Sequence, residues 1–338
     1  MTGYFLGVDI GGSKSHALVA DENGRALGFG ETGPGNHEVV GYPGLVTALQ
    51  SVTGRAFASA GLRREQICAA GFGVAGYDWP SELAPTLEAI GTLKLDAPLE
   101  VVNDAVIGLL AGAKEGWGLV LIAGTGNNCR GRDRAGREGR VTGCGDWFGE
   151  YGGAGDLVIR AVQSIAFEWT QRGPATRLTQ AFVDLVGACD VEDLLEGLAM
   201  ERYRLNASSA PLVFQVARQG DPVAREVIQW AGRELGGLAT GVIHQLQFEA
   251  LDFEVVLAGS TFDIGPMLVD PLRETIHETA PGARLKRLSV PPVVGATLLA
   301  MRQEGLDGPD PRQTLIETTR GLLASVGRRP VEGSTHAA

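Results

Sequence analysis

The sequence has few cysteines, a deficit of positive charge and no long apolar stretch. Its four cysteines, Cys68, Cys129, Cys144 and Cys189, stand alone along 338 residues. Because they form no Cys-x-x-Cys pair, neither a disulfide framework nor a zinc knuckle is expected, and a reducing compartment is favoured. No secretory segment opens the chain and no uncharged apolar run is long enough to span a bilayer. We therefore expect a cytoplasmic protein with no membrane partner.

The charge balance narrows the classes of partner. Lysine and arginine together number 29 against 40 aspartates and glutamates, giving a net charge of −11 and a pI of about 5.0. Nucleic acids and anionic membranes require clustered positive charge, so neither is expected to bind. The composition, 44% hydrophobic and 20% charged, is that of an ordinary globular protein. The length predicts two domains or one large one.

Short apolar runs punctuated by glycine, followed by longer helical patterns, predict an α/β fold. Strands are expected at YFLGVDIG, SHALVAD, RALGFGE, ICAAGFGVAG, LEVVND, EVVLAGS and ARLKRLS. Helices are expected at 43–60, from Asp78 and Pro80 onward, and at 105–113, 157–171, 175–186, 210–218, 222–247, 264–278 and 295–303. The tail at 328–338 has little apolar content and is predicted to be disordered.

A repeat appears when the segment 7–25 is moved by 112 positions. It then lies without gaps on 119–137, with Gly12 on Gly124 and Asp21 on Asp133. Both segments combine an apolar strand, a glycine with a hydroxyl residue, a second strand and an Asp-x-x-Gly-Arg turn. We interpret them as the openings of two related half-molecules. The alternative is that any two hairpins with glycine turns look alike.

The tips of these two hairpins carry groups that suit phosphate. Glycine allows backbone N–H groups to approach a ligand closely, and hydroxyl or ammonium groups add donors. The tip residues are Gly11, Gly12, Ser13 and Lys14 in the first hairpin and Gly124, Thr125 and Gly126 in the second. No P-loop pattern is present. Two Gly-x-Gly-x-x-Gly matches, at 28–33 and 71–76, lack the strand–turn–helix context of a dinucleotide site, and we interpret them as turn or hinge glycines.

Two aspartates end predicted strands, where α/β sheets place their ligands. Asp9 beside phosphate donors would repel a phosphate unless a cation such as Mg²⁺ intervened, so we assign it to the metal. The alternative is an aspartate that accepts from turn N–H groups. Asp104 follows LEVVN and is our candidate catalytic base, because it could orient an attacking hydroxyl. Its alternative role is to cap the helix that begins at Ala105.

These pieces together resemble the actin/hexokinase/Hsp70 ATPase superfamily, and within it the N-acetylglucosamine kinase and BadF-type ATPase family. The resemblance rests on DIGGSKSHALVAD, GNH at 35–37, ND at 103–104, IAGTGNNCRG at 122–131 and LAGS at 257–260. It implies two actin-like (ribonuclease H-like) domains around a nucleotide cleft, at 1–117 and 118–294, the second with a helical insertion. The last helical region, about 295–325, would pack back on the first domain.

The resemblance also implies roles for particular residues. ATP and Mg²⁺ would be the cofactors, with Gly259 and Ser260 near the adenosine and the two hairpin tips on the phosphates. An amino sugar would be the substrate, most simply N-acetylglucosamine or glucosamine, phosphorylated on its 6-hydroxyl, and a homodimer is suggested. The implied sugar contacts are Asn36, His37, Asn103, Asp104, Thr125 and Asn128. For Asn36 the alternative is a simple turn residue after Pro34 and Gly35.

One segment departs from the family pattern. Where the family has Gly-Asp-Glu-Gly-Ser, this chain reads GEYGG at 149–153. Glu150 could still accept from sugar hydroxyls, and Asp146 could supply the missing carboxylate. Because Tyr151 replaces a charged residue, the identity of the sugar stays open.

Two other functions compete with the kinase. A BadF-type activator of a dehydratase would need cysteine ligands for an iron–sulfur cluster that bridges a dimer. Cys129 and Cys144 are too isolated in the sequence to form a convincing cluster motif. A non-catalytic sugar or nucleotide sensor is disfavoured because Asp9, Asp104 and both phosphate tips are present.

Overall fold

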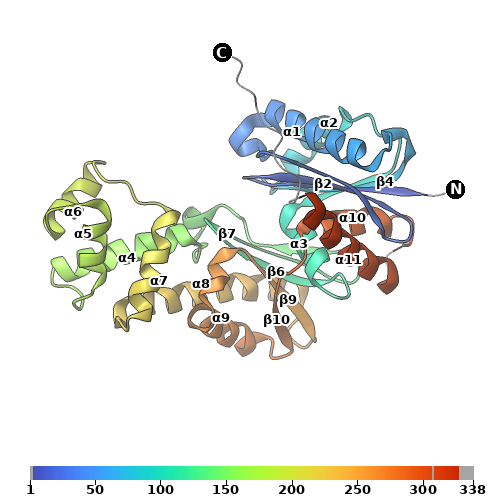
Figure 1. Ribbon diagram of the computed structural model, residues 1–338. Helices are drawn as coiled ribbons and strands as arrows, with labels where there is room; N and C mark the ends of the chain where they lie inside the picture. The colour runs from blue at the N-terminus through green and yellow to red at the C-terminus, as the bar shows by residue number, and fades with distance from the viewer. Residues whose placement is uncertain (1–2, 307, 327–338) are drawn as a thin grey trace, which may run out of the picture. The chain divides into compact units, whose positions relative to one another are not determined.

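A computed structural model describes residues 3–306 and 308–326 (Figure 1). The predicted disordered tail at 328–338 lies outside the described residues. The chain forms two compact units. Unit 1 comprises the chain up to Gly116 and again from Leu288, and unit 2 comprises Trp117–Arg287.

Unit 1 is built on a five-stranded sheet of order β3-β2-β1-β4-β5. Its elements are β1 (Tyr4–Ile10), β2 (Ser15–Asp21), β3 (Ala26–Thr32), α1 (His37–Ala60), β4 (Ile67–Val74), α2 (Leu83–Gly91), β5 (Leu99–Asn103), α3 (Asp104–Gly112), α10 (Pro292–Arg302) and α11 (Pro309–Val326). The strands β1, β2 and β3 form an antiparallel meander, and β4 and β5 continue from β1 in parallel.

Helices cover both faces of this sheet, α1 and α2 on one and α3, α10 and α11 on the other (Figure 1). Glycines in the strands let these helices approach closely. A side chain at Gly30 would meet the Val52 carbonyl of α1 at 2.2 Å, and one at Gly71 would meet the Ala296 carbonyl of α10 at 2.2 Å. Four of the six glycines in the two rejected Gly-x-Gly-x-x-Gly matches lie within strands and serve helix–sheet packing there.

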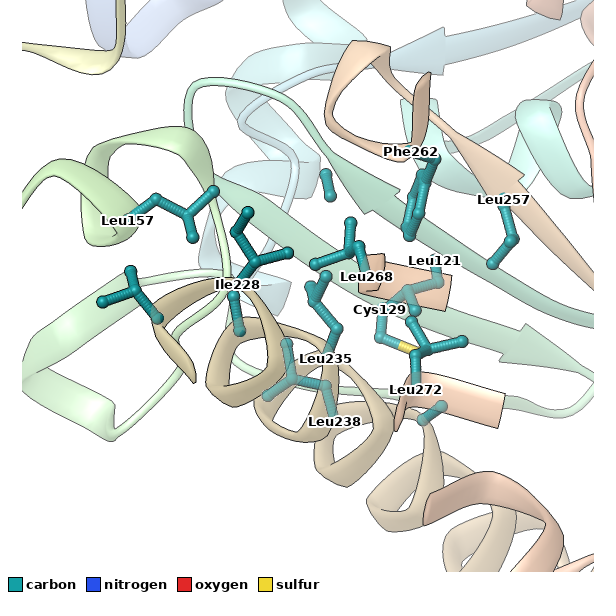
Figure 2. Close-up of a cluster of buried hydrophobic side chains, with 14 of the residues drawn as sticks. Leu121, Cys129, Leu157, Ile228, Leu235, Leu238, Leu257, Phe262, Leu268 and Leu272 are labelled. Atoms are coloured by element: carbon teal, nitrogen blue, oxygen red, sulfur yellow. The ribbon is translucent and has the colours of Figure 1, made fainter. Parts of the chain in front are cut away.

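Unit 2 is built on a second five-stranded sheet, of order β10-β9-β6-β7-β8. Its elements are β6 (Gly118–Ala123), β7 (Asn127–Arg132), β8 (Glu138–Arg140), α4 (Ala154–Trp169), α5 (Leu178–Val186), α6 (Val191–Ala199), α7 (Ala210–Arg218), α8 (Pro222–Leu246), β9 (Phe253–Ala258), α9 (Pro266–Thr279) and β10 (Ala283–Arg287). Figure 2 shows its core, where Leu121 and Cys129 of β6 and β7 meet Leu235 of α8 and Leu272 of α9.

The two sheets have the same topology, which confirms the predicted repeat. In each, an antiparallel hairpin (β1–β2 or β6–β7) leads into a third strand, and two later strands add in parallel on the other side. The register at the hairpin tips differs by one residue. Four residues lie between the paired Ile10 and Ser15, whereas three lie between the paired Ala123 and Asn127. The second tip is therefore the tighter of the two.

Most predicted elements occur where the sequence pattern placed them, with a few differences. Helix α1 begins at His37, with a break at Gly41 (φ 68°), rather than at Pro43. The helix expected after Asp78 starts as a 3-10 turn, Pro80–Glu82, before α2. The helices α6 and α11 and the short strand β8 were not separately predicted. Within the described residues, no helix is both long and apolar enough to cross a bilayer.

Candidate functional site

The candidate residues of unit 1 gather at one edge of its sheet. The strands β1, β3, β4 and β5 run in the same direction, so their carboxyl ends meet at that edge. Two backbone bonds tie the following loops together there: Gly35 N–H donates to the Gly11 carbonyl (3.0 Å), and Ala75 N–H donates to the Ile10 carbonyl (2.8 Å). Open α/β sheets bind ligands at such edges.

The first hairpin tip leaves room for a ligand. Gly11 N–H donates to the Lys14 carbonyl (3.1 Å), which closes the turn, and Gly12, Ser13 and Lys14 are exposed. A Cβ atom placed on Gly12 would have no protein atom within 4 Å, and the φ angle of Gly12 does not lie in the left-handed region that favours glycine. Neither sterics nor backbone conformation within the protein therefore explains this glycine. A ligand that approaches the backbone closely would explain it.

Asp9 belongs to a chain of charged side chains that extends across β1, β2 and β3. His16 pairs with Asp9 across the hairpin, its Nδ1 3.6 Å from Asp9 Oδ2, and its Nε2 lies 3.2 Å from Glu31 Oε2. Lys14 Nζ lies 3.3 Å from Glu31 Oε1. Hydrogen bonding to Asp9 raises the pKa of His16 against the opposing effect of burial, and the Lys14 hydrogen bond lowers the pKa of Glu31.

Sequence reasoning missed His16 and Glu31. Strand pairing could have identified them, since a hairpin with its tip at 11–14 places residue 16 opposite residue 9.

Among the described residues, no group of three or more histidines, cysteines or carboxylates is arranged to hold a metal ion. A Mg²⁺ ion at Asp9 would therefore take its other ligands from phosphate and water, as this ion commonly does.

Asn103, and not Asp104, provides the cap of α3 that the sequence offered as the alternative role of Asp104. Asn103 is the N-cap of α3 and accepts from Ala105 N–H (3.0 Å). Its Nδ2 donates to the Tyr77 carbonyl (3.2 Å) and to Asp78 Oδ1 (3.3 Å). Asp104 is the first residue of the helix and partly buried, so its carboxylate is not the cap.

Asn36 is the N-cap of helix α1, a role that the sequence analysis did not predict. Its Oδ1 accepts from Glu38 N–H (2.9 Å), and its Nδ2 donates to Glu38 Oε2 (3.1 Å). His37 stacks on Tyr42 with ring centroids 4.5 Å apart, and only 9% of its side chain is exposed. Its buried Nδ1 has no hydrogen-bond partner in the protein. A hydrogen-bonding atom of a ligand would satisfy it.

The second hairpin tip brings together three segments that are far apart in the sequence. The Gly124 carbonyl accepts from Ala154 N–H at the start of α4 (2.9 Å) and from Thr261 Oγ1 (3.2 Å). Gly259 has φ 100°, and a side chain there would meet the Ala123 carbonyl at 2.1 Å. The expected adenosine segment at Gly259 thus lies against the expected phosphate tip. Cβ atoms at Gly124 and at Gly126 would each meet open space.

The loop that departs from the family pattern is held by Glu150. This residue is 5% exposed, and its carboxylate accepts the N–H groups of Thr142 (2.6 Å), Gly143 (2.8 Å) and Cys144 (3.1 Å). The Glu150 carboxylate thus fixes the backbone of this loop, and its expected sugar contact stays a prediction. Asp146 is exposed on the same loop, and its carbonyl accepts from Tyr151 Oη (3.3 Å).

Two further side chains complete this region. Asn128 Oδ1 is buried and has no partner in the protein. Asp156, which sequence reasoning missed, accepts from Gly152 and Gly153 N–H (2.9 Å each) and from Asn127 Nδ2 (3.5 Å). Burial raises the pKa of Asp156. The sequence could have indicated this role, because Asp156 lies three residues after Gly153, from where a carboxylate can reach back to the start of α4.

Comparison with solved structures identifies the architecture as the actin-like fold. A structure described as a candidate N-acetylglucosamine kinase from Chromobacterium violaceum aligns with a TM-score of 0.62 at 24% identity, covering 88% of this chain and 98% of that one. A ROK-family glucokinase from Streptomyces griseus, solved with glucose and AMPPNP, aligns with a TM-score of 0.54 at 24% identity, covering 89% and 100%. The expected α/β class and actin-like fold are thus confirmed.

The chain belongs to the BadF/BadG/BcrA/BcrD ATPase family, whose sequence profile matches residues 6–300. It is 26% identical over 299 residues to the N-acetylmuramic acid/N-acetylglucosamine kinase of Clostridium acetobutylicum, covering 88% of this chain and 98% of the relative. It is also 26% identical over 323 residues to the N-acetyl-D-glucosamine kinase of Dictyostelium discoideum, covering 89% and 98%. The family expected from the sequence is confirmed.

Proposed function

We propose that this protein is an ATP-dependent sugar kinase that phosphorylates the 6-hydroxyl of an amino sugar, N-acetylglucosamine or glucosamine. The observation that carries the proposal is the pair of glycine tips at equivalent sheet edges, where Gly12, Gly124 and Gly126 each leave open the space a side chain would fill. The two relatives named as N-acetylglucosamine kinases, which are covered nearly end to end, support the same class of acceptor.

In this proposal the tips hold the phosphates of ATP through backbone N–H groups, Ser13, Thr125 and Lys14. Gly259 and Ser260 face the adenosine. Asp9 holds Mg²⁺, which would supply charge neutralisation at the phosphates. Phosphoryl transfer depends on positioning and electrostatics more than on covalent chemistry, so these residues would supply much of the rate enhancement.

Asp104 is the proposed catalytic base. The attacking sugar hydroxyl donates its hydrogen bond to the Asp104 carboxylate, which orients it and takes its proton. The new bond from the sugar oxygen to the γ-phosphorus forms as the bond from that phosphorus to the β,γ-bridging oxygen breaks, and ADP leaves. Asp104 lies in the first turn of α3, where the N-terminal end of the helix dipole attracts negative charge. The proposed sugar contacts are Asn36, His37, Asn103, Thr125, Asn128 and Asp146.

The BadF-type activator is the competing function within the family. It would need cysteines that can ligate a cluster between two subunits. Cys129 does not fit, because its thiol is buried in the core of unit 2 (Figure 2) and burial raises its pKa. Cys68, Cys144 and Cys189 are exposed at separate places in the sequence.

The test is ADP release from Mg-ATP with N-acetylglucosamine, glucosamine, N-acetylmannosamine, N-acetylmuramic acid, glucose or no sugar. Strong stimulation by one amino sugar, with its 6-phosphate found by mass spectrometry, is expected. ADP release that is the same with and without every sugar would contradict the kinase and favour the activator. No ADP release under any condition would favour the sensor.

A further inference from the structure

The loop Gly76–Glu82 joins the two parts of unit 1 that carry proposed sugar contacts. On one side, a side chain at Gly76 (φ 81°) would meet Asn36 Oδ1 at 2.4 Å, which shows how closely this loop packs against the start of α1. On the other side, Asn103 Nδ2 donates to the Tyr77 carbonyl and to Asp78 Oδ1. The loop therefore lies between Asn36 and the candidate base, Asp104.

Glu82 holds this loop. Its Oε2 accepts from both Asp78 N–H and Trp79 N–H, each at 2.7 Å. Its Oε1 lies 3.7 Å from Nε2 of His37, the first residue of α1. The Glu82 side chain is 20% exposed, so these contacts are partly shielded from water. A single carboxylate thus fixes the backbone of one loop and faces the histidine that begins helix α1.

A purely local role would not extend this far. A glutamate that only caps its own turn needs the two N–H groups and nothing else. Here the same carboxylate also faces His37, whose Nδ1 is buried without a protein partner. A buried nitrogen without a partner has a cost unless a ligand or water satisfies it. His37 is therefore held by Tyr42 and Glu82 with one nitrogen left for another group.

We propose that Glu82 is a positioning residue for the acceptor sugar, and that the loop it fixes, with Asp78 and Trp79, forms a wall of the sugar site. This inference rests on the proposed kinase function. Asp78 would accept from a hydroxyl or amide N–H of the sugar, and Trp79, which is 39% exposed, would cover an apolar face of the ring. Glu82 itself does not touch the sugar.

The experiment compares steady-state kinetics of Glu82→Ala and Glu82→Gln with Glu88→Gln, which removes an exposed carboxylate from α2, the helix that begins directly after Glu82. Losing the two N–H contacts and the contact with His37 should raise the KM for the sugar about 10-fold or more in Glu82→Ala, since hydrogen bonds to charged groups contribute on this scale. The KM for ATP should change less than about twofold and kcat less than about threefold. Glu88→Gln should match the wild type.

Glu82→Gln keeps the shape of the side chain and one acceptor oxygen. Its KM for the sugar should therefore lie between those of the wild type and Glu82→Ala. Thermal unfolding of each variant and sugar binding by calorimetry without ATP separate a loosened loop from a failure to fold. An unchanged sugar KM in Glu82→Ala, or equal losses for sugar and ATP, would overturn the positioning role while leaving the kinase intact. A wild type that responds to no sugar would remove the proposed function and this inference with it.

Discussion

Asp21 and Asp133 make the same hydrogen bonds in the two units, 112 positions apart in the chain. Asp21 Oδ1 accepts from Asn23 N–H (3.0 Å) and Arg25 N–H (2.8 Å), and Asp133 Oδ1 accepts from Ala135 N–H (2.9 Å) and Arg137 N–H (2.8 Å). A glycine with positive φ follows three residues later in each case, Gly24 at 77° and Gly136 at 86°. The repeat is thus visible in single atoms as well as in topology.

The first prediction concerns these turns. Asp21→Ala and Asp133→Ala should each lower the free energy of unfolding by about 1–2 kcal/mol, because two N–H groups lose a charged acceptor. The double variant should show the sum, since the two aspartates belong to different compact units. Urea unfolding measures all three, with Asp96→Ala, an exposed loop aspartate, as the control. If only one of the two single variants lost stability, the equal hydrogen-bond geometry of the two turns would not contribute equally to the free energy of unfolding.

The second prediction concerns the candidate base. Asp104→Asn should lower kcat for sugar phosphorylation by about 100-fold or more, because an amide cannot take the proton of the attacking hydroxyl. Nucleotide affinity, measured by calorimetry with a non-hydrolysable ATP analogue, should stay within about twofold of the wild type. Asp96→Asn serves as the control. Near-normal turnover in Asp104→Asn would remove Asp104 from the role of base.

The third prediction separates ligand space from protein packing. Gly12→Ala should leave the melting temperature nearly unchanged, because the new methyl group meets no protein atom within 4 Å. It should raise the KM for ATP about 10-fold or more, since the methyl group would occupy space that we assign to phosphate. Gly91→Ala, which also meets no atom within 4 Å, is the matched control at the end of α2. Unchanged ATP kinetics in Gly12→Ala would contradict the first phosphate tip.

The fourth prediction concerns the metal. Asp9→Asn should raise the Mg²⁺ concentration needed for half-maximal activity by about 10-fold or more, because one negative ligand charge is lost. The Mg²⁺ dependence is measured by ADP release at fixed ATP, again beside Asp96→Asn. An unchanged Mg²⁺ dependence would mean that Asp9 binds no metal and only pairs with His16 within the sheet.

The fifth prediction is a pH dependence of stability that arises at Asp221, at the start of helix α8. Asp221 is the N-cap of α8, and its carboxylate accepts from Ala224 N–H (2.8 Å), Arg177 N–H (2.8 Å) and Thr176 Oγ1 (3.0 Å). Burial works to raise the pKa of Asp221, but these hydrogen bonds outweigh it and leave the pKa below the ordinary value.

A carboxyl whose pKa is lower in the folded state stabilises the fold above its unfolded value and loses that effect as the pH falls. Asp221→Asn should therefore lower the free energy of unfolding by about 1–3 kcal/mol at pH 7, with a difference that shrinks below about pH 4. Asp190→Asn, at the exposed N-cap of α6, is the control and should change little. A difference for Asp221→Asn that is constant from pH 7 to pH 3 would contradict the charge effect.

Local patterns predicted the repeat, the strands and the hairpin tips well. Apolar runs ending in glycine specify strand and turn within a few residues, and the offset of 112 was readable because both hairpins keep an Asp-x-x-Gly-Arg turn. Packing among loops was harder to foresee. Asp78 was expected to start a helix, whereas Glu82, four residues later, reaches back to bind its N–H group. Asn103, not Asp104, caps α3.

Glu150 shows the same limit at a proposed ligand position. Its place in GEYGG suggested a sugar contact, but three backbone N–H groups converge on its carboxylate once the segment 142–150 is folded. His16 and Glu31 became visible only when β1, β2 and β3 were paired in register. In each case the deciding partner lies on a turn or strand whose path depends on the folded chain.

The sequence by itself determined the α/β class, the internal repeat and which residue types stand at the strand ends, because alternation, glycine placement and strand-terminal carboxylates are local properties. Only the tertiary structure decided which of those side chains hold loops and which keep room for a ligand. Hydrogen-bond donors and acceptors are satisfied by whatever the fold brings within about 3 Å. The carboxylates of Glu82 and Glu150 accept hydrogen bonds from backbone N–H groups in this way, whereas Gly12, Gly124 and Gly126 keep open space.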